Sequence, residues 1–193
     1  VVRHQSDAVG VGHDRAAQDT EALAVARIAL LGHDAGVAHG ALGNGVAVST
    51  VTTPTKLTGL NNVRRLFGYF RTFYTLKNDG SLWAWGYNSN GKIGNGGTAN
   101  VLVPTQITGL TNVIAVAPGA VHTAYLKSDG SVVASGFDFY GSVGDGASGA
   151  DQLTPMPVVT STNPVTPLTG IRKVVAGMYH TLALDEAGRI WAW

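Results

Sequence analysis

The chain has 193 residues, of which 45% are hydrophobic and 13% are charged, and its formal net charge is +1. The charged share is about half of the ~25% usual in globular domains, and no basic block is present, which argues against nucleic acid as a direct partner. The chain has no cysteine, which excludes disulfides and thiolate metal sites. Its longest apolar stretch, residues 22–31, is shorter than the about 20 residues that a membrane span needs.

Residues 1–39 form a first segment without a clear motif. We favour an eroded copy of the repeat described next, while a helix, or a segment that is not natural coding sequence, remain alternatives. Scattered His and Asp residues are candidate metal ligands. No His-Glu-x-x-His motif accompanies them, so we predict no metal site. These candidates are His13-Asp14, His33-Asp34 and His39.

Residues 40–193 contain an internal repeat. Its period of roughly 50 to 60 residues is in the range of propeller blades. A glycine-rich run near residue 40 is the tail of an earlier copy, because it matches residues 91–96. The three copies open with Leu57-Thr58-Gly59, Ile107-Thr108-Gly109 and Leu168-Thr169-Gly170.

Each copy predicts a β-hairpin, because Asp-Gly between two apolar runs is a strong turn signal. The 26 glycines are about twice the usual ~7% share and also favour tight turns. We expect residues 73–76 to pair with 82–85, and residues 123–126 with 132–135, around Asp79-Gly80 and Asp129-Gly130. Two sets of equivalent side chains should be buried: Leu76, Leu126 and Leu184, and Ala84, Ala134 and Ala192.

All four tryptophans lie in two equivalent strands, so we interpret them as packing between blades rather than as a ligand platform. Trp191 and Trp193 should be more exposed than Trp83 and Trp85, because no further strand follows them.

The side chains and loops that could bind a ligand or take part in catalysis are better interpreted as structural. His122 and His180 occupy equivalent positions, and we expect each imidazole to bond a backbone group. The runs at residues 94–97 and 141–146 lack the Lys-Ser/Thr pair of phosphate loops, so we interpret them as turns. Asp145 and Asp151 show no regular Ca²⁺-binding spacing. We therefore assign no catalytic, cofactor-binding or metal residue and expect no cofactor.

One long segment is the best candidate contact region. Residues 148–167 are longer than their counterpart at 98–106 and carry four prolines. Loops on rigid scaffolds carry function disproportionately, and the alternative interpretation is a tolerated surface insertion.

The repeat resembles the regulator-of-chromosome-condensation repeat family. The resemblance covers about residues 40–193. It rests on the three openings above, on residues 175–184, and on Trp83-Ala84-Trp85-Gly86 followed by Gly91-Lys92-Ile93-Gly94-Asn95-Gly96. It implies an all-β fold, a β-propeller of antiparallel four-stranded blades. The family ring has seven blades, of which this chain holds two to three.

The resemblance implies a protein-protein interaction scaffold rather than an enzyme. Low charge and the lack of convergent catalytic groups agree with this expectation. We expect a protein partner, and favour a bacterial protein placed outside the cell or at its surface. Alternatives are guanine-nucleotide exchange on a small GTPase, by analogy with the founding member, and inhibition of a hydrolase. Unpaired blade ends also predict poor solubility, or self-association of the isolated chain.

Overall fold

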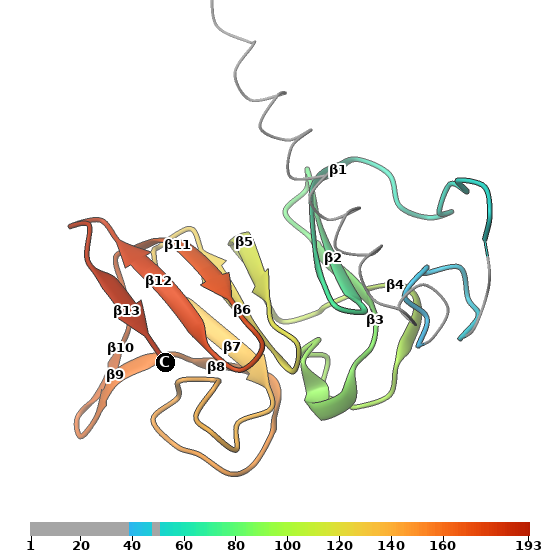
Figure 1. Ribbon diagram of the computed structural model, residues 1–193. Coiled ribbons are helices and arrows are strands. Elements are labelled where there is room, and N and C mark those ends of the chain that lie inside the picture. The colour runs from blue at the N-terminus through green and yellow to red at the C-terminus, as the bar shows by residue number, and fades with distance from the viewer. Residues whose placement is uncertain (1–38, 48–50) are drawn as a thin grey trace, which may run out of the picture.

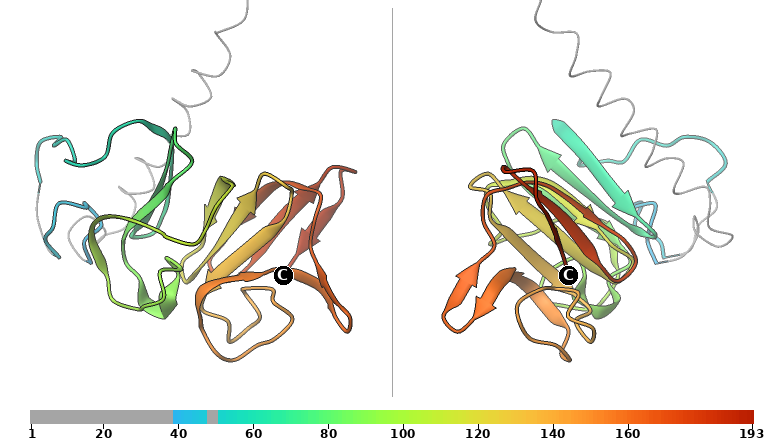
Figure 2. Two further views of the ribbon diagram at one scale, coloured as in Figure 1. Left: turned by 180° about the vertical axis from the view of Figure 1, so that it is seen from behind. Right: turned by 60° about the vertical axis from the view of Figure 1, so that its left-hand side comes forward.

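The computed structural model describes residues 39–47 and 51–193, and the repeat folds into consecutive antiparallel β-sheets (Figure 1). The three main sheets follow one another along the chain and lie side by side in Figure 1 and in the left view of Figure 2. The fold is therefore an all-β partial propeller. The described residues contain no helix long and apolar enough to cross a membrane. Residues 1–38, which include His13-Asp14 and His33-Asp34, lie outside the described part.

The first two blades are complete, with strands in the order of the chain. Both predicted hairpins are confirmed, since Thr75 pairs with Trp83 and Tyr125 with Val133. Gly80 and Gly130 have positive φ at the turns, a conformation that glycine adopts without steric cost. Blade 1 consists of β1 (Val63–Tyr69), β2 (Thr72–Lys77), β3 (Leu82–Gly86) and β4 (Val101–Gln106), with the short 3-10 turn η1 (Ser89–Gly91) before β4; blade 2 consists of β5 (Val113–Pro118), β6 (His122–Lys127), β7 (Val132–Gly136) and β8 (Gln152–Pro157).

Blade 3 has three strands, β11 (Ile171–Ala176), β12 (Thr181–Asp185) and β13 (Ile190–Ala192). A separate hairpin of β9 (Val159–Thr162) and β10 (Val165–Pro167) precedes it. Residues 148–167, predicted to be a long loop, thus contain strand β8 and this inserted hairpin. The insertion explains why β11 starts 58 residues after β5, whereas β5 starts 50 residues after β1.

The apolar core runs through the blades at the predicted repeat positions. Leu76, Leu126, Ala84 and Ala134 are buried, as expected. The expectation is wrong for the third copy, where Leu184 is only half-buried and Ala192 is exposed. Within the described residues, β13 pairs with β12 alone, so no neighbouring strand covers its outer edge.

Glycine-rich loops, which in blades 1 and 2 lie between the third and fourth strands, pack against the following blade. We call residues 40–45, 91–96 and 141–146 glycine loops 1, 2 and 3. A Cβ atom on Gly43 would lie 2.9 Å from the Trp85 ring, and one on Gly144 would lie 2.7 Å from the Trp193 ring. Trp193 therefore packs between blades 2 and 3, as predicted, and Trp85 packs against glycine loop 1.

The exposure of the tryptophans follows the prediction in part. Trp193 is half-buried, whereas the equivalent Trp85 is buried, as predicted. Trp191 and the equivalent Trp83 are both half-buried, so they do not show the predicted difference. The Trp83 indole donates to the Ser81 hydroxyl, and the Trp191 indole donates to Asp185.

Candidate functional site

An exposed group of aromatic side chains lies where blade 2 meets blade 3. We call Phe137, Phe139, Tyr140 and Tyr179 the aromatic cluster. The rings of Phe139 and Tyr140 meet edge to face with centroids 5.1 Å apart. Tyr179, from the β11–β12 turn, approaches Phe137 and Tyr140 with centroids 6.2 Å away in each case. The cluster thus combines side chains from two blades.

Solvent reaches most of this cluster. Tyr140 is 72% exposed, Phe139 60% and Tyr179 46%. The neighbouring Met178 is also exposed. Contiguous exposed apolar side chains mark interaction sites, and aromatic residues and Met are enriched at protein interfaces. The chemistry of this surface therefore suits the binding of another protein.

Buried hydrogen bonds hold the loop that carries the cluster. Phe137 N–H donates to Val121 O at 3.0 Å, which ties the loop to the β5–β6 turn. The buried Asp138 carboxylate accepts from Val143 N–H at 2.9 Å, and burial raises its pKa. The Ser142 hydroxyl donates to Tyr179 O at 2.9 Å. The two halves of the cluster are therefore linked across the blade boundary.

Blade 1 carries a smaller aromatic group at the equivalent place. Tyr87 corresponds to Phe137 and contacts the Phe70 ring, with centroids 6.1 Å apart. Ser89 and Asn90 stand where blade 2 has Phe139 and Tyr140. The exposed aromatic surface is therefore a feature of blade 2 and not of the repeat in general.

A buried polar layer lies beneath the loops, between blades 1 and 2. Lys92 is fully buried, and its Nζ donates to Gly119 O at 2.6 Å and to Ala120 O at 3.1 Å. Burial lowers the pKa of Lys92 to about 7. The Tyr125 hydroxyl donates to Ile93 O at 2.9 Å, and burial raises its pKa to about 12. These groups connect the blades and have no access to a solvent-borne substrate.

The two equivalent histidines differ in environment. His122 is fully buried, and its Nε2 lies 2.8 Å from the Thr181 hydroxyl of blade 3. Burial, together with the nearby charges of Lys92 and His180, lowers the pKa of His122 to about 4. We expected a backbone partner, but the Nε2 partner is a side-chain hydroxyl. His180 is exposed.

The structure does not bring together the other side chains that were weighed as metal ligands. Asp145 accepts from Ala147 N–H in its own loop, whereas Asp151 accepts from the Asn90 amide of blade 1. His39 lies beside Tyr87 and Arg71. In the described part of the chain, no group of three or more His, Cys, Asp or Glu side chains is placed to hold a metal ion.

Sequence reasoning selected residues 148–167 as the contact region and missed the aromatic cluster. A signal was present, since Phe139 and Tyr140 replace Ser89 and Asn90 in an otherwise matching loop. An aromatic side chain at a loop position that is polar in the neighbouring copy indicates a surface with a specific role.

Comparison with known proteins agrees with the repeat. Residues 79–126 match the family model described as the regulator of chromosome condensation (RCC1) repeat. The chain is similar to human WBSCR16, at 25% identity and a TM-score of 0.63, over 80% of this chain and 40% of that chain. A search of the curated proteins finds no match.

Two yeast structures share the fold. One is the crystal structure of Kap60 bound to yeast RCC1 (Prp20), at 24% identity and a TM-score of 0.56, covering 70% of this chain and 32% of that chain. The other is Prp20p from Saccharomyces cerevisiae, at 23% identity and a TM-score of 0.54, covering 70% and 34%. This chain spans less than half the length of each of these three structures.

Proposed function

We propose that this chain, which is built from regulator of chromosome condensation (RCC1) repeats, is a non-catalytic scaffold that binds another protein through its aromatic cluster. The observation that carries the proposal is the exposure of Phe139, Tyr140 and Tyr179 on loops that buried hydrogen bonds hold in place. A rigid aromatic surface binds at low entropic cost, because little side-chain and loop freedom is lost.

The similar structures support a protein partner in general terms. Yeast RCC1 (Prp20) is seen with Kap60 bound, and the Prp20p structure is described together with its binding to Gsp1p and histones. These partners belong to those proteins. For this chain they support the class of partner, and the aromatic cluster supports the place of contact.

Binding to a candidate partner tests the proposal. The double variant Phe139→Ser/Tyr140→Ser removes two exposed rings, while Val165→Ser removes an equally exposed apolar side chain from the inserted hairpin. We expect the double variant to lose at least about tenfold in affinity, equivalent to about 1.4 kcal/mol, and Val165→Ser to bind as the native chain does. Equal affinity of all three proteins would refute the assignment of the cluster.

Nucleotide exchange on a small GTPase is the alternative function. It would appear as faster release of a fluorescent guanine nucleotide from members of a GTPase panel when the chain is added. Exchange activity would replace the scaffold proposal, even if the aromatic cluster also contacted the GTPase. Inhibition of a hydrolase is tested in the same way, with an enzyme panel.

A further inference from the structure

One buried position after the third strand carries a different side chain in blades 1 and 2. Blade 1 has Asn88 there and blade 2 has Asp138, and these residues are 0% and 1% exposed. In both, the Oδ1 atom accepts from a backbone N–H five residues later, that of Ile93 at 2.8 Å and that of Val143 at 2.9 Å. Asn88 Nδ2 and Asp138 Oδ2 therefore occupy equivalent places in their loops.

In blade 1, this place holds a hydrogen-bond donor surrounded by oxygen atoms. Asn88 Nδ2 donates to Asn95 Oδ1 at 3.1 Å. It also donates to the carbonyl oxygens of Gly97 and Ala99, at 2.9 Å and 3.2 Å. The amide thus satisfies three acceptors that the loop directs inward.

In blade 2, the same place holds an acceptor. Asp138 Oδ2 is buried and has no hydrogen-bond partner among the described residues. Asp145 and Ala147 stand where blade 1 has Asn95 and Gly97. Asp145 Oδ1 accepts from Ala147 N–H at 2.9 Å, as Asn95 Oδ1 accepts from the equivalent N–H at 3.2 Å, so the loop keeps its shape there. Oxygen atoms therefore face an oxygen atom, and a buried carboxylate oxygen without a partner is costly.

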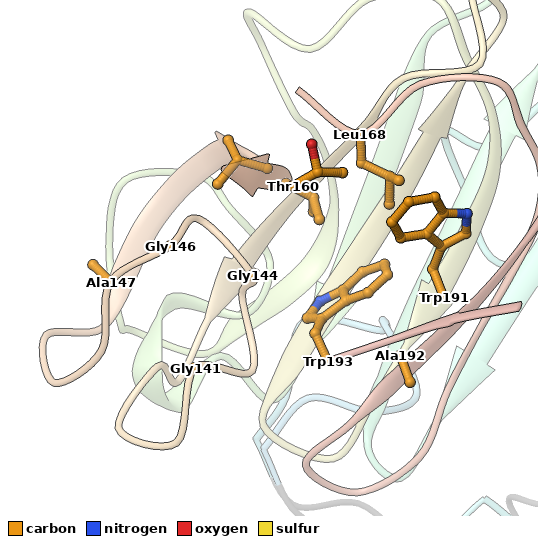
Figure 3. Close-up of a pocket in the computed structure, with 11 residues that line it drawn as sticks. Gly141, Gly144, Gly146, Ala147, Thr160, Leu168, Trp191, Ala192 and Trp193 are labelled. Carbon is orange, nitrogen blue, oxygen red and sulfur yellow. The ribbon is translucent and has the colours of Figure 1, made fainter. Parts of the chain in front are cut away.

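The loop after Asp138 turns back on itself, and we call residues 138–149 the Asp138 loop. Figure 3 shows its course from Gly141 to Ala147. Asp138 O accepts from the N–H groups of Gly141 and Gly149, each at 3.0 Å, so the loop closes on this residue. A Cβ atom on Gly141 would lie 3.8 Å from Ala147 O, which places this carbonyl on the inner side. Residues 146–149 are exposed, so water and ions reach the loop.

The surroundings of Asp138 are negatively charged. Burial raises the pKa of Asp138, and the nearby carboxylates of Asp145 and Asp151 raise it further. Asp151 accepts from Asn90 Nδ2 at 2.7 Å. Within the described residues, none of the three carboxylates has an ion-pair partner. The arrangement thus concentrates negative charge around a buried oxygen, which favours a cation there.

We propose that the Asp138 loop binds a calcium ion between Asp138 Oδ2, the Asp145 carboxylate and Ala147 O. Ca²⁺ takes carboxylate and backbone carbonyl oxygens as ligands in a flexible geometry, and water completes its shell. Two carboxylates match its charge. No group of three His, Cys, Asp or Glu side chains is placed to hold a metal in the described part of the chain. With only two charged ligands, we expect a Kd of about 10⁻⁴ to 10⁻³ M.

The proposal goes beyond the proposed function and does not rest on it. Asp138 lies between Phe137 and Phe139 in the sequence, so the ion would also hold the segment that carries most of the aromatic cluster. Ca²⁺ binding requires no partner protein, and it can be measured on the chain alone.

Thermal unfolding of the 193-residue chain, after removal of metal with a chelator, measures this binding. An ion that binds only the folded state raises Tm. We expect CaCl2 at about 10 mM to raise Tm by roughly 3 °C or more, relative to NaCl at equal ionic strength. MgCl2 should raise Tm by less, because Mg²⁺ demands a near-ideal octahedral geometry.

Matched variants locate the ion. Asp138→Asn gives blade 2 the side chain of blade 1, so it should fold, equal or exceed the native chain in Tm without metal, and gain nothing from Ca²⁺. Asp145→Asn keeps the Oδ1 acceptor and should lose most of the Ca²⁺ response. Glu186→Gln removes one exposed charge from blade 3 and should respond as the native chain does. Phe139→Ser/Tyr140→Ser should also respond, which separates this site from the proposed function.

Four results would each overturn the proposal. They are the absence of a Ca²⁺ response in the native chain, an equal response to MgCl2, a native response in Asp138→Asn or Asp145→Asn, and equal losses in Asp138→Asn and Glu186→Gln. The first result would mean that a proton, and not an ion, satisfies Asp138 Oδ2.

Discussion

The Nε2 atom of His122 lies 2.8 Å from the hydroxyl of Thr181 across the boundary between blades 2 and 3. The equivalent threonine of blade 2, Thr123, lies 2.9 Å from the Tyr74 hydroxyl of blade 1. All four side chains are fully buried. The same threonine position therefore receives a polar group from the preceding blade at both boundaries, although the group differs. Buried polar pairs of this kind fix the relative position of blades, because an unpaired partner would be costly.

Protonation of His122 should destabilise the fold in acid. Its pKa is about 4 in the folded chain and 6.5 as an ordinary imidazole. Between these values the unfolded state binds more protons, so the free energy of unfolding falls as pH drops from 6.5 toward 4. Relative to His122→Gln, we expect the native chain to lose roughly 2 kcal/mol by about pH 5. Denaturant unfolding at several pH values measures this, and parallel pH profiles for the two proteins would contradict it.

Lys92 should make the fold more stable in mild alkali. Burial lowers its pKa from 10.5 to about 7, so the unfolded state binds more protons within that window. The free energy of unfolding therefore rises with pH above 7, by roughly 2 kcal/mol at about pH 9. We expect Lys92→Met to lack this rise and Lys56→Met, at an exposed position, to keep it. A rise in Lys92→Met equal to that of the native chain would show that another group titrates.

Alanine substitutions at three glycines should lower the free energy of unfolding by different amounts. Gly91, Gly109 and Gly141 all have positive φ, so alanine is strained at each. Only at Gly91 would the added Cβ atom also overlap with backbone, 2.8 Å from the Leu153 Cα atom, because at Gly141 the nearest atom, Ala147 O, would be at an ordinary contact distance of 3.8 Å. We expect Gly91→Ala to cost at least about 1 kcal/mol more than Gly109→Ala or Gly141→Ala. Denaturant unfolding at low protein concentration checks the order, and equal costs at all three positions would refute the packing of glycine loop 2 on β8.

The aromatic cluster should contribute little to folding stability. Phe139 and Tyr140 are mostly exposed, so Phe139→Ser/Tyr140→Ser should change the free energy of unfolding by about 0.5 kcal/mol or less. Phe137 is half-buried and touches three other rings, so Phe137→Ser should cost more than about 1 kcal/mol. Calorimetric unfolding compares the two. A large loss in the double variant would mean that these rings are structural.

Local turn chemistry and the repeat together made most of the fold predictable. Asp79-Gly80 and Asp129-Gly130 fixed two hairpins, and their spacing aligned the blades. The difference in length between the copies did not predict the structure of the extra residues. The residues inserted before Leu168 form a hairpin, and no periodic sequence pattern predicts it. Ala192 shows the limit of equivalence between copies, since its burial depends on a neighbouring strand and not on its own repeat position.

The candidate site was harder to predict than the fold. Burial of Lys92 and the pairing of His122 with Thr181 depend on contacts between blades, which pairing rules within one blade do not describe. The exposed rings of Phe139 and Tyr140 lie in a loop whose glycines dominate the repeat signal. They become visible when the two loops are compared position by position.

Site-specific photo-crosslinking tests the central claim, that the aromatic cluster is a protein-binding surface, most directly. A photoreactive phenylalanine analogue is placed at residue 139 in one protein and at residue 165, on the inserted hairpin, in another. A partner that binds the native chain should be crosslinked at residue 139, and weakly or not at all at residue 165. An excess of native chain without the photoreactive residue should abolish the crosslinking. Equal crosslinking at both positions, or crosslinking at residue 165 alone, would contradict the claim.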